Sequence, residues 1–462
     1  MDARGGDRHR LPTTATSGDV PAPALSTFDA IMITVGIVIG AGIFQTPALV
    51  AGIAGSPTLM LIAWALGGVL SFIGALTYAE LAGAYPSAGG DYTFLTRAYG
   101  RDVSFLFAWA RSTVICTGSI ALLGFILGDY LTRLFDLGRY SSAWYAAIAT
   151  LVLTAINLVG LRSSSRMQNA LGILEVGGVL LVAVAGMTVE AKPVVTQGTD
   201  AVSPGAFGLA MVFVLLTYGG WNEAAYVSAE VRGGARAVLR TLVWSIAIIT
   251  AVYLLFVLGA LHGLGFEGLE ASHALGVDIM ERAFGPVSGQ LVGVIVTISA
   301  LTSMNSTMLV GARTNYAVAH DWPAFGFMGQ WRGARNTPVI GLLVQMAIAL
   351  ALITFGAFEK SGFAAMVEFT APVFWFFFML SGIAVFVLRR RDPQVPRPVR
   401  VPLYPVLPLG FVVTCAYLFY SSIVHAQSEH AGYIALLVMA SGALVWLAIG
   451  PLRARSWTRS SQ

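Results

Sequence analysis

Long apolar runs separated by short polar segments repeat along the whole chain. A helix needs about 20 predominantly apolar residues to cross the hydrocarbon core of a bilayer, and each run is about that long or longer. The pattern therefore predicts an all-α polytopic membrane protein with twelve transmembrane helices. The runs cover residues 29–54, 58–84, 102–134, 140–160, 168–188, 204–230, 236–262, 286–318, 338–356, 363–388, 405–425 and 431–450.

Composition excludes a soluble multidomain protein. Of the 462 residues, 56% are hydrophobic and only 11% are charged, whereas a soluble domain carries about 25% charged residues. Residues 1–23 are polar, lack the apolar stretch of a signal peptide, and are expected to form a disordered cytoplasmic tail. The sequence contains no GxxxxGK[ST] nucleotide motif, no HExxH metal motif and no CxxC pair, so we expect no enzyme activity, metal or cofactor.

Basic residues predict the orientation, because cytoplasmic loops of membrane proteins are enriched in Lys and Arg. Most arginines lie in or beside the loops that follow even-numbered spans, among them Arg97, Arg101, Arg162, Arg232, Arg236, Arg389, Arg390, Arg391 and Arg397. The opposite loops hold only Arg133, Arg139, Lys192, Arg282 and Lys360. We therefore expect a multi-pass protein of the inner or plasma membrane with both termini in the cytoplasm.

Two apolar runs carry paired glycines where ordinary spanning helices are continuous. The first reads V-G-I-V-I-G-A-G-I-F-Q-T-P (35–47) and the sixth reads L-L-T-Y-G-G-W-N-E-A-A-Y (215–226). Glycine adopts non-helical conformations readily, and interrupted helices at matching positions of two halves point to a transporter site. The alternative is that these glycines only allow close helix packing. The interrupted reading predicts a first inverted repeat over 24–200, a second over 201–391, and two added helices and a cytoplasmic tail over 392–462.

Such breaks would expose backbone groups of opposite polarity. Unpaired N–H groups at Ala41, Gly42 and Ile43 would attract an anion. Carbonyls around Leu216, Tyr218 and Gly219 would attract a cation. One site with both features suits a zwitterion, namely an α-amino acid.

The ordered motifs of the chain resemble the amino acid–polyamine–organocation (APC) superfamily, most closely its L-type amino acid transporter-like branch. They are G-A-G-I-F-Q-T-P (40–47), Y-A-E-L-A-G-A-Y-P-S-A-G-G-D-Y (78–92), T-A-I-N (154–157), S-R-M-Q-N (165–169), Y-G-G-W-N (218–222), A-E-V (229–231) and A-R-T-N-Y-A-V-A-H-D (312–321).

This resemblance implies a LeuT-type 5+5 inverted repeat and secondary active transport by alternating access. It implies that the substrate carboxylate binds at Gly40, Ala41, Gly42 and Ile43. The amino group would bind at Leu216, Tyr218 and Gly219, with Leu216 or Tyr218 helping to close the site. Gly220, Trp221 and Asn222 would complete the second interrupted segment. Related branches carry a lysine at the position of Glu175, so the role of that lysine as a stand-in for a coupling cation does not transfer.

Charged residues inside apolar runs are functional candidates by default. Glu175 has no basic residue one turn away, and the hypothesis is that it binds and releases a proton; the alternative is a hydrogen-bonded structural carboxyl. Glu223 would either favour a cationic substrate or simply suit the start of a half-helix. Arg111 needs a buried partner, and Glu80 and Glu230 are the candidates, as a gate or a brace.

The predicted function is therefore amino acid transport, as proton-coupled symport or amino acid exchange. A polyamine or organic cation carrier of the same fold is a first rival, and a channel or receptor-like membrane protein is a second. The expected partners are an amino acid, the lipid bilayer and, in the symport case, protons; no nucleic acid is expected. The loop near 133–140 lacks the cysteine through which some L-type relatives bind an ancillary subunit, so no disulfide-linked subunit is expected. The identity of the amino acid, the coupling ion, the direction of transport and the oligomeric state stay open.

Overall fold

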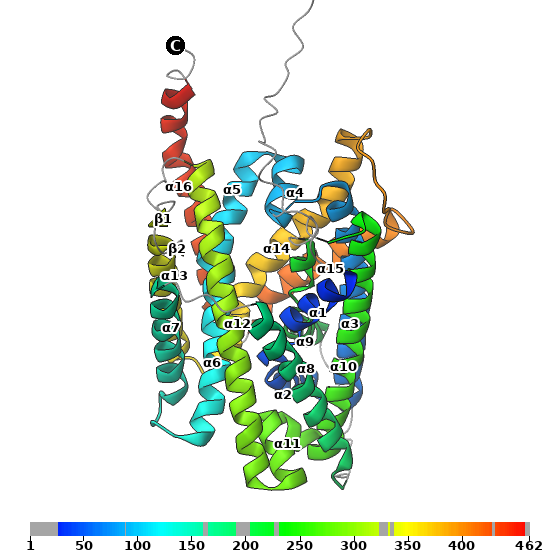
Figure 1. The fold of residues 1–462 in the computed structure, drawn as a ribbon, viewed down its shortest axis with the longest axis vertical. Helices are drawn as coiled ribbons and strands as arrows, with labels where there is room; N and C mark the ends of the chain where they lie inside the picture. The colour runs from blue at the N-terminus through cyan, green and yellow to red at the C-terminus, as the bar shows by residue number, and fades with distance from the viewer. Residues whose placement is uncertain are drawn as a thin grey trace, which may run out of the picture.

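The computed structural model is a bundle of helices (Figure 1). It describes residues 26–87, 89–159, 165–190, 204–225, 231–322, 331–332, 337–426 and 430–457. The helices of the first half are α1 (Thr27–Val38), α2 (Thr46–Ala54), α3 (Pro57–Ala84), α4 (Gly90–Tyr99), α5 (Arg101–Ala110), α6 (Cys116–Leu134), α7 (Ser141–Val159) and α8 (Ser165–Thr188). Those of the second are α9 (Pro204–Thr217), α10 (Gly234–Glu270), α11 (Leu275–Phe284), α12 (Pro286–Asp321), α13 (Val339–Gly356), α14 (Gly362–Arg391), α15 (Val406–Val424) and α16 (Ala431–Trp457).

Within the described ranges, 9 helices are long and apolar enough to cross a membrane. Three further apolar helices are shorter: Thr27–Val38, Gly172–Thr188 and Pro204–Thr217. The prediction of an all-helical polytopic membrane protein is confirmed at this level, while the count of twelve spans and the inverted repeat stay predictions. The described residues also include a short antiparallel pair, β1 (Trp331–Arg332) with β2 (Thr337–Pro338).

Two predicted interruptions coincide with breaks in the helices. The run 29–54 divides into α1, a 3₁₀ turn (Ala41–Phe44) and α2, and the run 204–230 into α9 and a 3₁₀ turn (Trp221–Ala225), after which 226–230 lie outside the described residues. A third irregularity was not predicted: a π-helical segment, Arg111–Ile115, joins α5 to α6. Such π segments are rare and occur frequently at functional sites.

The bundle has two distinct ends. α4 and the C-terminal part of α16 lie at one end and α11 at the other (Figure 1). At the α4 end, the Arg391 guanidinium donates to the Arg97 carbonyl at 3.2 Å, so two of the basic segments predicted on one side do meet there. The segment between the predicted runs 236–262 and 286–318 is largely helical, because α10 continues to Glu270 across a break at Gly265 and α11 follows.

The breaks lie inside the bundle, where other helices hold them. α10 packs along α1, α3 and α8, while α12 packs along α6. Because Gly186 and Gly259 have no Cβ, α8 and α10 can approach until their backbones are in contact. The interrupted segments are therefore enclosed by continuous helices rather than exposed to lipid, as broken backbone in a membrane requires.

Candidate functional site

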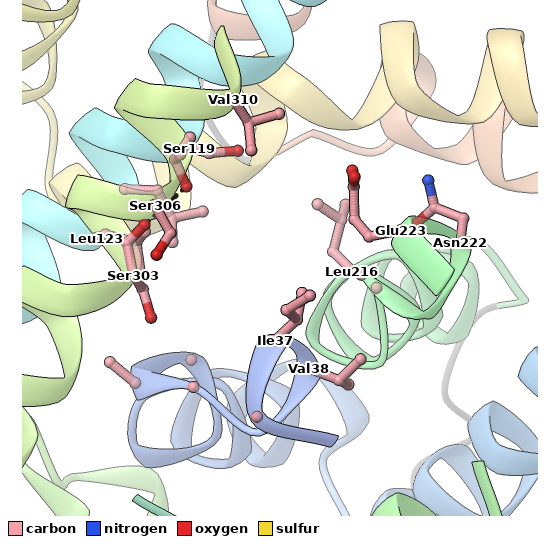
Figure 2. A pocket seen from close by; sticks show the side chains of 18 of the residues that line it. Ile37, Val38, Ser119, Leu123, Leu216, Asn222, Glu223, Ser303, Ser306 and Val310 are labelled. Atoms are coloured by element: carbon pink, nitrogen blue, oxygen red, sulfur yellow. Dashed lines mark hydrogen bonds between the residues drawn. The ribbon is translucent and has the colours of Figure 1, made fainter. Parts of the chain in front are cut away.

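A cavity of about 990 Å³ lies between the interrupted segments and the continuous helices around them. Most of its lining comes from α1, α6, α8, α9, α12 and α14 and from both breaks, and single residues of α4, the π segment and other helices complete it. In Figure 2, Ile37 and Val38 lie on one side, Leu216, Asn222 and Glu223 on a second, and Ser119, Leu123, Ser303, Ser306 and Val310 opposite them. Cavities of about 300–1,000 Å³ are typical of small-molecule sites.

The break after α1 leaves backbone N–H groups without helical partners at the edge of this cavity. The Ile39 N–H still bonds the Val35 carbonyl at 2.7 Å, and the Gly40 N–H bonds the Val38 carbonyl at 2.9 Å. Gly40 is extended and the 3₁₀ turn begins at Ala41. The first N–H groups of such a turn have no carbonyl partner within it. Gly40, Ala41 and Gly42 line the cavity, so this edge offers donors to an anionic group.

The break after α9 is a tight turn at a glycine with positive φ. The Gly219 N–H bonds the Leu216 carbonyl at 3.0 Å, and the Glu223 N–H bonds the Gly220 carbonyl at 3.0 Å. Gly220 has φ +104°, and a Cβ there would lie 3.1 Å from Ile37 Cγ2. Only glycine adopts this conformation without strain, and only glycine lets the two breaks approach so closely.

Side chains from other helices fasten the two breaks together. The Tyr253 hydroxyl of α10 lies 2.7 Å from the Val38 carbonyl and 3.1 Å from the Thr217 carbonyl. A tyrosine has one hydroxyl proton, so it donates to one of these carbonyls at a time. The Thr46 and Thr217 hydroxyls are also hydrogen-bonded, at 2.7 Å. Sequence reasoning missed Tyr253, because a tyrosine in an apolar run gives no signal that separates this role from packing.

Replacing Tyr253 with phenylalanine is expected to lower the uptake rate roughly fivefold, because a hydrogen bond contributes about 1 kcal/mol to holding the two breaks in place. Initial rates of uptake by the reconstituted protein measure the effect. Tyr433→Phe, at an exposed position of α16, serves as the matched control and should transport at the wild-type rate. Equal rates for both variants would contradict the assignment of Tyr253 as a positioning residue.

The predicted site residues separate into two groups. Gly40, Ala41, Gly42, Leu216, Gly219, Gly220 and Asn222 line the cavity. Ile43, Tyr218 and Trp221 are buried and are absent from its described lining.

The Tyr218 and Trp221 side chains pack behind the cavity wall. The Tyr218 hydroxyl donates to the Trp64 carbonyl at 3.1 Å, and the Tyr218 ring lies 5.0 Å from that of Tyr253. The Trp221 ring contacts those of Tyr78 and Phe378. The Tyr218 hydroxyl points into the bundle toward α3, and the part of Leu216 or Tyr218 in closing the site stays a prediction. Leu216 keeps a position on the cavity wall.

Arg111 pairs with Glu223, not with Glu80 as expected. The Arg111 Nη2 and Glu223 Oε1 atoms lie 3.0 Å apart, and both residues line the cavity. The expected pairing with Glu80 was therefore wrong, and the alternative reading of Glu223 as a residue that only suits a half-helix start is incomplete. Glu230, the other expected partner, lies outside the described residues.

Glu80 instead braces the α4 end of the bundle. Arg389 Nε and Nη2 donate to its two carboxylate oxygens at 2.7 and 2.6 Å. The Val401 N–H donates to Glu80 Oε2 at 2.7 Å, and Arg397 lies 3.7 Å from Oε1. The carboxylate thus ties α3 to α14 and to the segment that follows it, away from the cavity.

Glu175 lines the cavity from α8 and is hydrogen-bonded to the Ser299 hydroxyl of α12. The side chain is buried, as expected for an ionisable group within an apolar run. The contact joins α8 to α12. It leaves both readings of Glu175, proton carrier and structural carboxyl, compatible with the geometry.

Asp91 is a cavity-lining residue that sequence reasoning did not single out. Its carboxylate accepts hydrogen bonds from the Tyr78 hydroxyl at 2.6 Å, the Ser381 hydroxyl at 3.0 Å and the Asn222 amide at 3.4 Å. Burial raises the pKa of Asp91, against the hydrogen bond from Tyr78 and the charge of Arg111. Because α4 is not among the long apolar helices, the motif that contains Asp91 gave no sign of burial.

The cavity lining extends to the N-terminal end of α1, and hydrogen bonds cross the bundle on the side toward α11. Along α1 the lining reaches Phe28 and Asp29. Toward α11, the Tyr130 hydroxyl lies 3.3 Å from the Phe44 carbonyl and accepts the Gly276 N–H at 3.2 Å. The Gln45 amide donates to the Asp129 carboxylate at 2.8 Å on the same side. These hydrogen bonds lie on the α11 side of the first break.

The sequence profile described as amino acid permease matches residues 25–441. The chain is 28% identical over 386 residues to the serine/threonine exchanger SteT of Bacillus subtilis (strain 168), covering 82% of this chain and 86% of that protein. It is 26% identical over 431 residues to the human b(0,+)-type amino acid transporter 1 (91% and 87% covered) and 26% identical over 397 residues to the human cystine/glutamate transporter (84% and 78% covered).

Proposed function

Because the chain belongs to the amino acid permease family of the APC superfamily, it is a membrane transporter rather than an enzyme, and we propose that it moves amino acids through the cavity between its two helix breaks. Its relatives include an exchanger and several amino acid transporters, which supports amino acid transport as the general activity. The finer proposal is secondary active transport by alternating access, as proton-coupled symport or amino acid exchange.

The observation that carries the proposal is the meeting of both breaks on one cavity. The N–H groups of Ala41 and Gly42, at the start of the 3₁₀ turn, lie at one edge, and the carbonyls around Leu216 and Gly219, at the C-terminal end of α9 and in the turn that follows it, lie at another. The Leu216 carbonyl already accepts the Gly219 N–H, but a carbonyl oxygen has two lone pairs and can accept a second donor. A zwitterion would satisfy both edges at once, with its carboxylate at Gly40–Gly42 and its ammonium at the carbonyls.

The sidedness of the cavity supports the alternating-access part of the proposal. Alternating access requires two states, each open to one side of the membrane. One such state would have a cavity whose lining reaches the N-terminal end of α1 and whose α11 side is crossed by hydrogen bonds. With both termini in the cytoplasm, this state faces inward. The opposite state would require separation of the Tyr130 and Gln45 contacts and closure around Phe28. In this account, 24–200 and 201–391 are the two inverted repeats.

Uptake by proteoliposomes tests the proposal. Labelled amino acids are supplied outside, with and without an inward proton gradient and with and without amino acid trapped inside. Saturable uptake that is stimulated by either condition is expected. Uptake that never saturates and shows no counterflow would indicate a channel. Competition by putrescine in place of amino acids would indicate the polyamine carrier.

A further inference from the structure

The Arg111–Glu223 ion pair occupies a distinctive place in the cavity wall. Arg111 begins the π-helical segment between α5 and α6, and Glu223 lies in the 3₁₀ turn that follows Gly220. The exposed fractions of the two side chains are 8% and 26%. The π segment and the second break, both departures from α-helix, thus bring opposite charges together at the edge of the site.

The other acidic residues of the described lining have partners of their own. The Asp29 carboxylate accepts a hydrogen bond from the Ser26 hydroxyl in the cap at the start of α1. Glu175 is hydrogen-bonded to Ser299, and Asp91 accepts hydrogen bonds from Tyr78, Ser381 and Asn222 and also feels the charge of Arg111. Among the described lining residues, Arg111 is the one basic side chain. Its direct ion-pair partner is Glu223.

The wall opposite the pair is uncharged and combines serine hydroxyl groups with the apolar side chains of Leu123 and Val310. Ser119 of α6 and Ser303 and Ser306 of α12 lie across the cavity from Glu223 (Figure 2). A substrate side chain that extends from the two breaks would therefore lie between hydroxyl groups and an ion pair whose charges cancel. A charged side chain would compete for one member of the pair and break the ion pair between Arg111 and Glu223 in a poorly solvated site, which is costly.

We propose that the Arg111–Glu223 pair sets the charge class of the substrate, so that the site accepts amino acids with uncharged side chains and rejects those with cationic or anionic ones. This inference rests on the proposed function and deepens it. It replaces the sequence-based hypothesis that Glu223 favours a cationic substrate. Selectivity of this kind arises from the penalty imposed on the wrong substrate as much as from attraction of the right one.

Single and double substitutions in the reconstituted protein test the inference. Uptake of a labelled mixture of serine, threonine and alanine is competed with unlabelled arginine or glutamate. In the wild type, neither charged amino acid should compete. Arg111→Gln leaves Glu223 facing the cavity. The concentration of arginine that halves uptake should therefore be about tenfold lower for this variant than for the wild type. Glu223→Gln leaves the Arg111 guanidinium facing the cavity, so the concentration of glutamate that halves uptake should fall by a similar factor. The double variant should again reject both arginine and glutamate.

The controls separate this role from a structural one. Arg133→Gln breaks a second ion pair, with Asp278 at 3.2 Å near α11, and should leave the competition pattern unchanged. Because the readout is a ratio between competitors, a lower amount of protein does not move it, and if one single variant fails to assemble the other still reports. Variants that keep the wild-type pattern, or a wild type that takes charged amino acids equally well, would overturn the inference. A wild type that transports no amino acid would overturn the proposed function itself.

Discussion

Replacing Gly220 with alanine is expected to lower amino acid uptake about tenfold or more while the protein still reaches the membrane. Gly220 has φ +104°, and an added Cβ would lie 3.1 Å from Ile37 Cγ2 and 3.4 Å from Val38 Cγ2. A non-glycine residue in such a conformation costs about 1–3 kcal/mol, and 1.4 kcal/mol is about tenfold in an equilibrium constant. The strain would act where the two breaks meet, so it should act on substrate binding first.

The matched control is Gly410→Ala on α15, where an added Cβ meets nothing within 4 Å. Alanine is the better helix former of the two, so this variant should transport like the wild type. Uptake is measured as initial rate over a series of substrate concentrations, with membrane abundance determined in parallel. A Gly220→Ala protein with wild-type rates would contradict the placement of the substrate at the second break.

Replacing Glu175 with glutamine is expected to abolish the stimulation of uptake by an inward proton gradient while exchange against trapped amino acid continues. Glutamine keeps the size of the side chain and its ability to contact Ser299, but it cannot bind and release a proton. The carboxyl lines the cavity and joins α8 to α12, so its protonation can influence both the substrate site and the packing of α1. The ratio of uptake with and without the gradient is the measurement.

Ser299→Ala is the companion variant, because it removes the hydrogen bond and leaves the carboxyl in place. It should keep gradient stimulation with an altered dependence on external pH. If Glu175→Gln retains full gradient stimulation, Glu175 is a structural carboxyl. If the wild type transports only against internal amino acid, exchange is the mechanism and Glu175 carries no coupling proton.

The breaks of the backbone were predictable, and the reason is local. Paired glycines in mid-run at Gly40/Gly42 and Gly219/Gly220 lower helix propensity by about 1 kcal/mol per residue, and no other part of the fold is needed to see this. The structure ends α1 at Val38 and α9 at Thr217, within a few residues of those glycines. The prediction that the site binds an α-amino acid rests on the same two segments.

The partners of the charged residues were not predictable, because each depends on long-range packing. Arg111 and Glu223 are separated by 112 positions and Arg389 and Glu80 by 309. The π-helical segment that begins at Arg111 also changes which way that side chain points. Runs that are apolar on all sides give no amphipathic face, so the burial of Tyr218 away from the cavity and the placement of Tyr253 between the breaks could not be assigned from the sequence.

Competition by substrate analogues most directly tests the claim that the two breaks bind an amino acid by its backbone groups. Uptake of labelled serine into proteoliposomes is competed with unlabelled serine, with ethanolamine, which lacks the carboxylate, and with glycerate, which lacks the amino group. The account predicts that serine competes and that neither analogue does at the same concentration, because each leaves one break unsatisfied. Equal competition by either analogue would contradict it, since the corresponding break would then play no part in binding.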